Sequence, residues 1–332
     1  MTTSARISYV IMAVLLVMTG WLHLATLVLT GLFGYFALNF LSFGKSKALS
    51  VLLYLIAVVG IACGLVYFSK RAYKALPAIA DESIPAVVNF AEQHDIELPF
   101  TDYASAKTLA VHEVKDRLAN LGRYAREATL HVAMLIIGVV VAISLFLNVR
   151  WGTESDPDVM KGSLYSTVVR ELALRFETFY ASFARVIGAQ IIISVINTGL
   201  TAVFLMWNGF PYATVIIMLT LLCGLLPIIG NIFSNTLVVG VAFTISPRMA
   251  LIALIFLMLI HKLEYFLNGK IIGDRIKSPL WLTLIGLILG EKLMGIPGMI
   301  FAPVVLHYIK VEASRNEVAE TAAPPLVAAA KL

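Results

Sequence analysis

Long apolar runs dominate the pattern of hydrophobic and polar positions along this chain. A helix needs about 20 consecutive, mostly apolar residues to cross the hydrocarbon core of a bilayer. Runs close to that length occupy residues 7–22, 24–43, 48–68, 132–147, 186–207 and 249–266. The pattern therefore predicts an all-α, polytopic integral membrane protein, with the lipid bilayer as its main partner.

Proline and glycine interrupt two further apolar segments. Residues 212–246 contain Pro227-Ile228-Ile229-Gly230-Asn231, and residues 280–309 contain Gly295-Ile296-Pro297-Gly298. Each arm of the second segment has about 15 residues, or roughly 22 Å of helix, which is short for a full crossing. We interpret both segments as re-entrant hairpins, because irregular backbone at membrane depth is tolerated only where it is buried in protein or lines a wet cavity.

Charges of both signs replace the apolar runs between the third and fourth spans. Residues 70–128 are predicted to form a small soluble helical insertion on the periplasmic side, with Pro77, Pro85 and Pro99 breaking it into short pieces. Residues 103–126 have apolar side chains at helical spacing and run without a breaker into the fourth span. One long helix is therefore expected to leave the insertion and enter the membrane.

Residues 150–185 begin as a loop and continue as a helix with one apolar face. Apolar side chains recur at intervals of three and four from Leu164 to Ile187, with charged side chains mostly on other faces. Those charged residues are Arg170, Glu171, Arg175, Glu177 and Arg185. The pattern favours an amphipathic helix on the cytoplasmic membrane surface, and it fits equally a helix packed on neighbouring spans.

The predicted regions follow one another as a three-span region (1–69), the insertion (70–128), the fourth span (129–149), the amphipathic helix (150–185), a core (186–311) and a disordered tail (312–332). The core contains two units of one span and one hairpin, which would enter the membrane from opposite sides as an inverted repeat. The distribution of basic loop residues places both termini in the cytoplasm. The cluster Lys70, Arg71 and Lys74 would then be external, against that rule.

Composition supports the membrane class and excludes several functions. The chain is 60% hydrophobic and 14% charged, whereas soluble domains are roughly 45–50% apolar and about 25% charged. Cys63 and Cys223 lie inside apolar stretches, and the six histidines are scattered singly. With no metal-ligand spacing, nucleotide loop or nucleophile motif, we expect no enzyme activity, no cofactor and no metal site. The formal charge of +5 without a basic patch makes nucleic acid an unsuitable partner.

Ionisable side chains concentrate in the last third of the chain. Glu264 follows His261 by three residues and precedes Asn268 by four, so the three share one helix face. Ionisable groups inside a bilayer are costly, and they commonly mark an ion or substrate pathway. The alternative for Glu264 is an interfacial ion pair with Lys262, Lys270 or Arg275.

Two asparagines lie beside the first proline break. Asn231 and Asn235 are four residues apart, next to backbone that Pro227 would leave unpaired. They could contact a small polar solute or a cation, or Asn231 could simply cap the second arm of the hairpin.

From Phe183 onward the chain resembles the autoinducer-2 exporter (AI-2E) family, also called PerM-type permeases. The resemblance rests on ordered, correctly spaced motifs, which are Gly188 with Gln190, Asn208 to Ala213, Leu226 to Gly230, Glu264 with Asn268, Lys270 to Arg275, Ser278 to Leu280, Gly290, Gly295 to Met299, and Ala302-Pro303. The chain departs from the family pattern at Gly269, where a proline is usual, and at Glu291, where a small residue is usual.

The resemblance implies about eight membrane crossings or equivalents and export of a small polar solute such as autoinducer-2, while some relatives are reported as sodium/proton antiporters. We expect a proton-coupled exporter in the bacterial inner membrane, assembled as a homo-oligomer. The alternatives are a sodium (lithium)/proton antiporter and a membrane scaffold without transport activity. The candidate pathway residues are Pro227, Gly230, Asn231, Asn235, Glu264, Asn268, Lys270, Asp274, Arg275, Glu291, Gly295, Pro297, Gly298 and Pro303.

Overall fold

A computed structural model describes residues 2–42, 46–95, 121–148, 163–226, 229–272 and 279–315. Every regular element in these ranges is an α-helix. In chain order they are α1 (Thr3–Trp21), α2 (Ala25–Leu41), α3 (Lys47–Gln93), α5 (Leu121–Asn148), α6 (Leu164–Trp207), α7 (Ala213–Cys223), α8 (Ile229–Ile245), α9 (Pro247–Ile272), α10 (Leu280–Met294) and α11 (Ile296–Arg315).

Six of the described helices are long and apolar enough to cross a membrane, namely α1, α3, α5, α6, α9 and α11. Their outer faces carry bare aliphatic side chains. Ile56, Val59 and Ile61 on α3, for example, are 60–64% exposed, an arrangement that suits lipid and not water. The all-helical class, with six helices that could span a membrane, is therefore confirmed, whereas the count of eight crossings and the re-entrant hairpins stay predictions.

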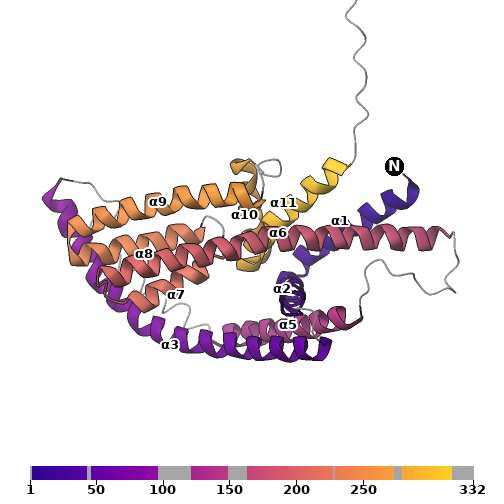
Figure 1. The fold of residues 1–332 in the computed structure, drawn as a ribbon, viewed down its shortest axis with the longest axis horizontal. Coiled ribbons are helices and arrows are strands. Elements are labelled where there is room, and N and C mark those ends of the chain that lie inside the picture. The colour runs from indigo at the N-terminus through magenta and orange to yellow at the C-terminus, as the bar shows by residue number, and fades with distance from the viewer. Residues whose placement is uncertain are drawn as a thin grey trace, which may run out of the picture.

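The long helix α6 joins two groups of helices (Figure 1). Near its C-terminal end, Leu205 packs with residues of α8 and α9 in one buried cluster. Nearer its N-terminal end, Phe179 and Phe183 pack with residues of α1, α2 and α11 in a second cluster. The ring of Phe183 is fully buried and meets Phe33 edge-on, with ring centroids 5.1 Å apart.

The helix α3 corrects the predicted insertion. It runs unbroken from Lys47 to Gln93 with Pro77 and Pro85 inside it, so the prediction that these prolines break the segment is wrong. A proline removes one amide donor and bends a helix without necessarily ending it. Figure 1 shows α3 bending in its second half, where buried Ile79 packs in the cluster that contains α8 and α9. Pro99 lies outside the described residues.

The helix α6 corrects the predicted amphipathic helix. A single helix spans Leu164–Trp207, with no break at residue 185. Phe179 and Phe183 face α1 and α11, so the segment packs on neighbouring spans instead of lying alone on the membrane surface. Arg175 is only 9% exposed, which contradicts its expected orientation away from the packed face.

The C-terminal boundary also moves. The helix α11 continues to Arg315, so the predicted tail begins too early, because residues 312–315 are helical. Residues 316–332 lie outside the described part of the chain.

Both predicted hairpins contain paired helices, α7 with α8 and α10 with α11. Glycine permits their close approach: a Cβ added to Gly290 would collide with the carbonyl oxygen of Gly298, and a Cβ added to Gly298 would collide with that of Gly290. Between α10 and α11, Gly295 adopts a positive φ of 64°, a conformation that favours glycine. In the first hairpin, a Cβ added to Gly230 would collide with the backbone of Cys223.

Candidate functional site

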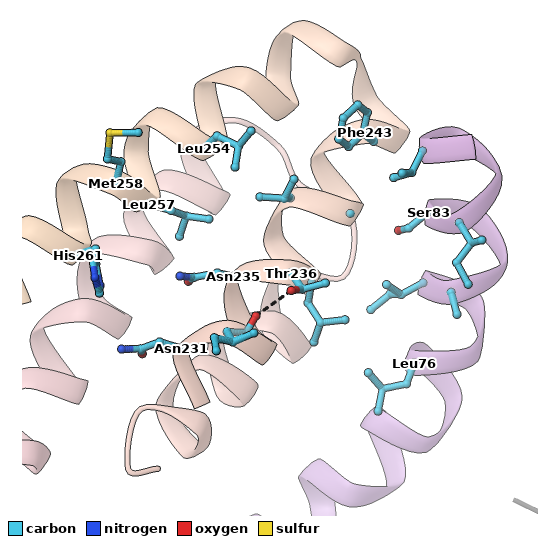
Figure 2. Close-up of a pocket in the computed structure, with 18 of the residues that line it drawn as sticks. Leu76, Ser83, Asn231, Asn235, Thr236, Phe243, Leu254, Leu257, Met258 and His261 are labelled. Atoms are coloured by element: carbon cyan, nitrogen blue, oxygen red, sulfur yellow. Dashed lines mark hydrogen bonds between the residues drawn. The ribbon is translucent and has the colours of Figure 1, made fainter. Parts of the chain in front are cut away.

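A cavity of about 1170 Å³ lies between α3, α8 and α9, with Leu284 of α10 also on its wall. Its lining is mainly aliphatic (Figure 2), including Leu76 from α3 and Leu254, Leu257 and Met258 from α9. Small-molecule sites typically combine such apolar walls with a few polar groups in fixed positions.

Four polar side chains of the cavity, Asn231, Asn235, His261 and Glu264, gather at one end. The side-chain amide of Asn231 donates a hydrogen bond of 2.8 Å to the Glu264 carboxylate. Asn235, one turn further along α8, and His261, one turn earlier on α9, line the same cavity. Figure 2 shows Asn231, Asn235 and His261 on the side of the cavity away from Ser83. The structure thus brings three candidate residues, Asn231, Asn235 and Glu264, to one place.

Local helix geometry explains this convergence. Asn231 is the third residue of α8, so it is not the capping residue of that arm. Residues four apart on a helix lie on the same face, which puts Asn235 above Asn231. Glu264 follows His261 by three residues, so both lie on the face of α9 that lines the cavity. All three candidate residues are half-buried.

The remaining candidates lie elsewhere in the structure or outside its described part. Lys270 is exposed, with its ammonium 5.9 Å from the ring centroid of Phe266. Glu291 is exposed and 3.9 Å from Lys292. The other described candidates, Gly230, Gly295, Pro297, Gly298 and Pro303, are not among the cavity-lining residues. The structure does not describe three further candidates, Pro227, Asp274 and Arg275, or the side chain of Asn268. Their roles stay predictions.

Sequence reasoning missed the contribution of α3 to this site. Ser83 is 7% exposed, lines the cavity and has no hydrogen-bond partner among the described residues. It lies against α8, because a Cβ added to Gly240 would approach the Ser83 Cβ at 3.4 Å. No local signal identifies Ser83, since the expected break at Pro77 and Pro85 removed this segment from the core.

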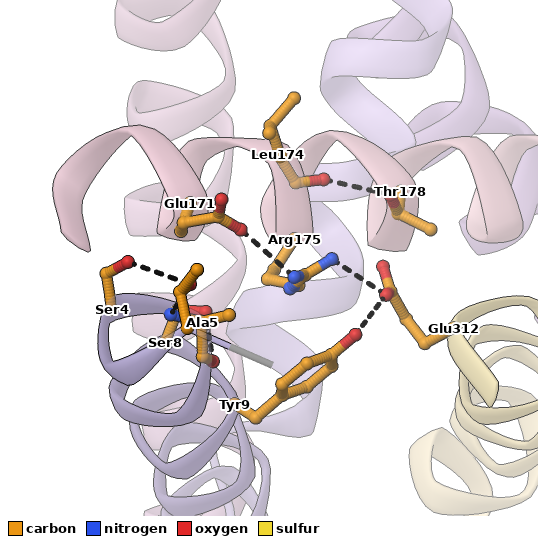
Figure 3. Close-up of polar contacts among 10 residues, drawn as sticks. Ser4, Ala5, Ser8, Tyr9, Glu171, Leu174, Arg175, Thr178 and Glu312 are labelled. Atoms are coloured by element: carbon orange, nitrogen blue, oxygen red, sulfur yellow. Dashed lines mark hydrogen bonds and ion pairs between the residues drawn. The ribbon is translucent and has the colours of Figure 1, made fainter. Parts of the chain in front are cut away.

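Sequence reasoning also missed a second polar cluster, in which α1, α6 and α11 meet (Figure 3). Arg175 donates hydrogen bonds to Glu312 at 2.9 Å and to Glu171 at 3.1 Å. Tyr9 donates to the same Glu312 oxygen at 2.9 Å, and its ring centroid is 4.2 Å from the guanidinium carbon. Glu312 is 4% exposed. The buried charges are paired with each other in this cluster. We therefore interpret it as a structural contact that holds α1, α6 and α11 together.

A comparison with known families decides the class of the protein. The model of the AI-2E family of transporters matches residues 6–314. The chain belongs to the AI-2E family. This membership confirms the resemblance found in the sequence and makes the chain a member of a transporter family.

A curated relative agrees with that family. The "Putative transport protein YdbI" of Bacillus subtilis (strain 168) is 29% identical over 142 residues, which cover 42% of this chain and 41% of the relative. The match therefore spans less than half the length of the curated relative. The likeness supports the transporter class, but the solute must be argued from the site.

Proposed function

We propose that this AI-2E family member is a secondary transporter of the bacterial inner membrane, which exports a small solute through the cavity between α3, α8 and α9. One observation carries the proposal: the Asn231–Glu264 pair faces a cavity of about 1170 Å³ whose walls include α3 and α9, two helices long and apolar enough to span a membrane. Family membership supports transport, and the outward direction follows the family resemblance.

Each polar group at the cavity end has a role in this proposal. Asn231 and Asn235 offer amide donors and acceptors to the polar part of the solute. Glu264 exchanges a proton during the transport cycle, because a carboxylate among apolar helices is stabilised when it binds a proton or a cation. Among the described residues, the other titratable groups that line this cavity are His261 and Tyr265, both on α9.

Proteoliposomes containing the full chain can test proton coupling, with autoinducer-2 as the probe. We expect flux that responds to an imposed pH gradient, and loss of this response in Glu264→Gln. Glu291→Gln is the matched control, because Glu291 is exposed and does not line the cavity. If the flux is unchanged by the pH gradient and unchanged in Glu264→Gln, proton coupling is removed from the proposal.

A sodium (lithium)/proton antiporter is the second candidate, and Glu264 favours it. Among the described residues, Glu264 is the one carboxylate that lines the cavity, and amide oxygens of Asn231 and Asn235 lie at the same end. Such oxygens are the ligands that hard cations prefer. If this candidate is correct, the chain will rescue growth of an antiporter-deficient strain on sodium or lithium, and Asn231→Ala will abolish the rescue. Failure of the unaltered chain to rescue growth counts against antiport.

A further inference from the structure

The cavity is suited to only part of the chemical space of small solutes. Its walls are aliphatic along α3, α8 and α9, with polar groups confined to a few positions. A fully hydrophilic solute would give up its hydrogen bonds to water against these walls without replacement, which is costly. An elongated solute with an apolar body would instead be favoured along its whole length.

The charge at the polar end selects the head group of such a solute. Glu264 is the charged side chain that the described residues contribute to the cavity, and no described lysine or arginine lines it. A carboxylate repels an anionic head and binds a protonated amine by charge-assisted hydrogen bonds. The Glu264 carboxylate already accepts one hydrogen bond from Asn231, which holds it in place for this contact.

An independent observation marks the opposite side of the cavity. The buried Ser83 hydroxyl has no partner among the described residues, and Figure 2 shows it directed from α3 toward α8. Buried polar groups normally form hydrogen bonds. Ser83 lies at the level of Gly240, nine residues after Asn231 on α8, and this separation corresponds to about 13 Å along the helix.

We propose that the cavity binds an amphipathic amine, with its ammonium group at Glu264 and Asn231, its apolar body between α3, α8 and α9, and a second polar group within reach of Ser83. This substrate class rests on the proposed transport through the same cavity. A phosphatidylethanolamine headgroup offers the same chemistry from the membrane. We assign the site to a free solute, because the proposed function requires a ligand that crosses and leaves.

Binding of labelled decylamine to the full chain in phosphatidylcholine nanodiscs tests the head-group assignment. We expect Glu264→Gln to weaken decylamine binding by about tenfold to a hundredfold, the range for hydrogen bonds to a charged group. Glu177→Gln, which removes an exposed carboxylate of α6, will leave binding unchanged. Decanol will bind both proteins equally, which shows that Glu264→Gln has kept its fold. Equal decylamine affinity for the two proteins, or tighter binding of decanoate than of decylamine, would overturn the assignment.

A ligand with a second polar group tests the proposed contact with Ser83. We expect 10-amino-1-decanol to bind more tightly than decylamine, and Ser83→Ala to remove that advantage, which is roughly twofold to tenfold. Decylamine itself will bind Ser83→Ala and the unaltered chain alike. If Ser83→Ala weakens both ligands equally, the second contact is wrong.

Further measurements distinguish binding of a free amine from binding of lipid, and distinguish the ligand class from the export proposal. Loss of decylamine binding when phosphatidylethanolamine is added to the nanodiscs would assign the site to a lipid headgroup. It would overturn the assignment to a free solute. Decylamine that binds as expected but is not carried into proteoliposomes would keep the ligand class and remove the export proposal. Autoinducer-2 flux that depends on Glu264, without any binding of decylamine, would keep the export proposal and remove the amine as the ligand class.

Discussion

The α7–α8 hairpin and the α10–α11 hairpin differ in what their arms face. In the first, α8 presents Asn231 and Asn235 to a cavity shared with α3 and α9. In the second, Gly290 and Gly298 bring the arms into backbone contact, and the far end of α11 places Glu312 in a buried ion pair with Arg175. The arms approach closely in both hairpins, but one arm of the first hairpin lines the cavity with polar side chains, whereas the second hairpin is anchored through a buried ion pair.

This difference separates polar groups that stabilise the fold from polar groups available for binding. Glu312 is 4% exposed and has partners on two other helices, so its charge is compensated within the protein. Glu264 is half-buried, with Asn231 as its hydrogen-bond donor and open cavity beside it. The environment of each carboxylate, more than its depth in an apolar helix, indicates its role.

The largest expected effect is at the anchored end of the second hairpin. Glu312→Ala leaves Arg175 buried with Glu171 as its remaining carboxylate, and we expect a loss of about 3–5 kcal/mol in the free energy of unfolding. Unfolding in mild detergent measures it. Glu171→Ala is the control and will cost less, because the Glu171 side chain is 21% exposed against 5% for Glu312. Equal losses would show that the cluster is not anchored through α11.

Closure of the second hairpin is tested by adding a methyl group between its arms. Gly298→Ala places a Cβ against the Gly290 backbone, so we expect a loss of about 1–3 kcal/mol from overpacking. The control is Gly199→Ala in α6, where no atom outside its own helix and chain neighbours lies within 4 Å of an added Cβ. That change will stabilise the helix by about 0.5–1 kcal/mol. A stable Gly298→Ala protein would mean that the arms can separate.

The cavity side is expected to respond in function more than in stability. Asn231→Ala removes one hydrogen bond from a half-buried carboxylate, and we expect unfolding to change by less than about 1.5 kcal/mol. Decylamine affinity will fall together with autoinducer-2 flux, as measured in nanodiscs and proteoliposomes. A large loss of stability without a change in binding would place Asn231 with Arg175 among the structural residues.

The smallest effect concerns a surface contact between α3 and the start of the first hairpin. Tyr212 donates a hydrogen bond of 2.8 Å to Glu82, and this bond raises the pKa of the Tyr212 hydroxyl above its ordinary value of 10.0. The contact is therefore fully present below the ordinary tyrosine pKa and is lost as pH rises through the raised one. An ultraviolet pH titration of the chain against Tyr212→Phe will show this, and Glu82→Gln will lower the pKa. An unchanged titration in Glu82→Gln would exclude the contact.

The sequence alone determined the all-helical class, the apolar runs from which six helices of spanning length form, the family and the two proline and glycine breaks. Apolar runs of spanning length have no other stable medium, and the motifs from Phe183 onward are local in the chain. It also selected Asn231 and Glu264 as separate candidates, because a polar side chain in an apolar run is conspicuous without any knowledge of its neighbours.

Only the tertiary structure decided which polar residues meet. Asn231 and Glu264 are 33 residues apart, and Arg175 and Glu312 are 137 apart, so no local spacing reveals either pair. Ser83 joined the cavity because α3 continues through two prolines. A hydrophobic face looks the same in sequence whether lipid or another helix covers it, and this ambiguity is why the packing of α6 and the burial of Arg175 became apparent only in the folded chain.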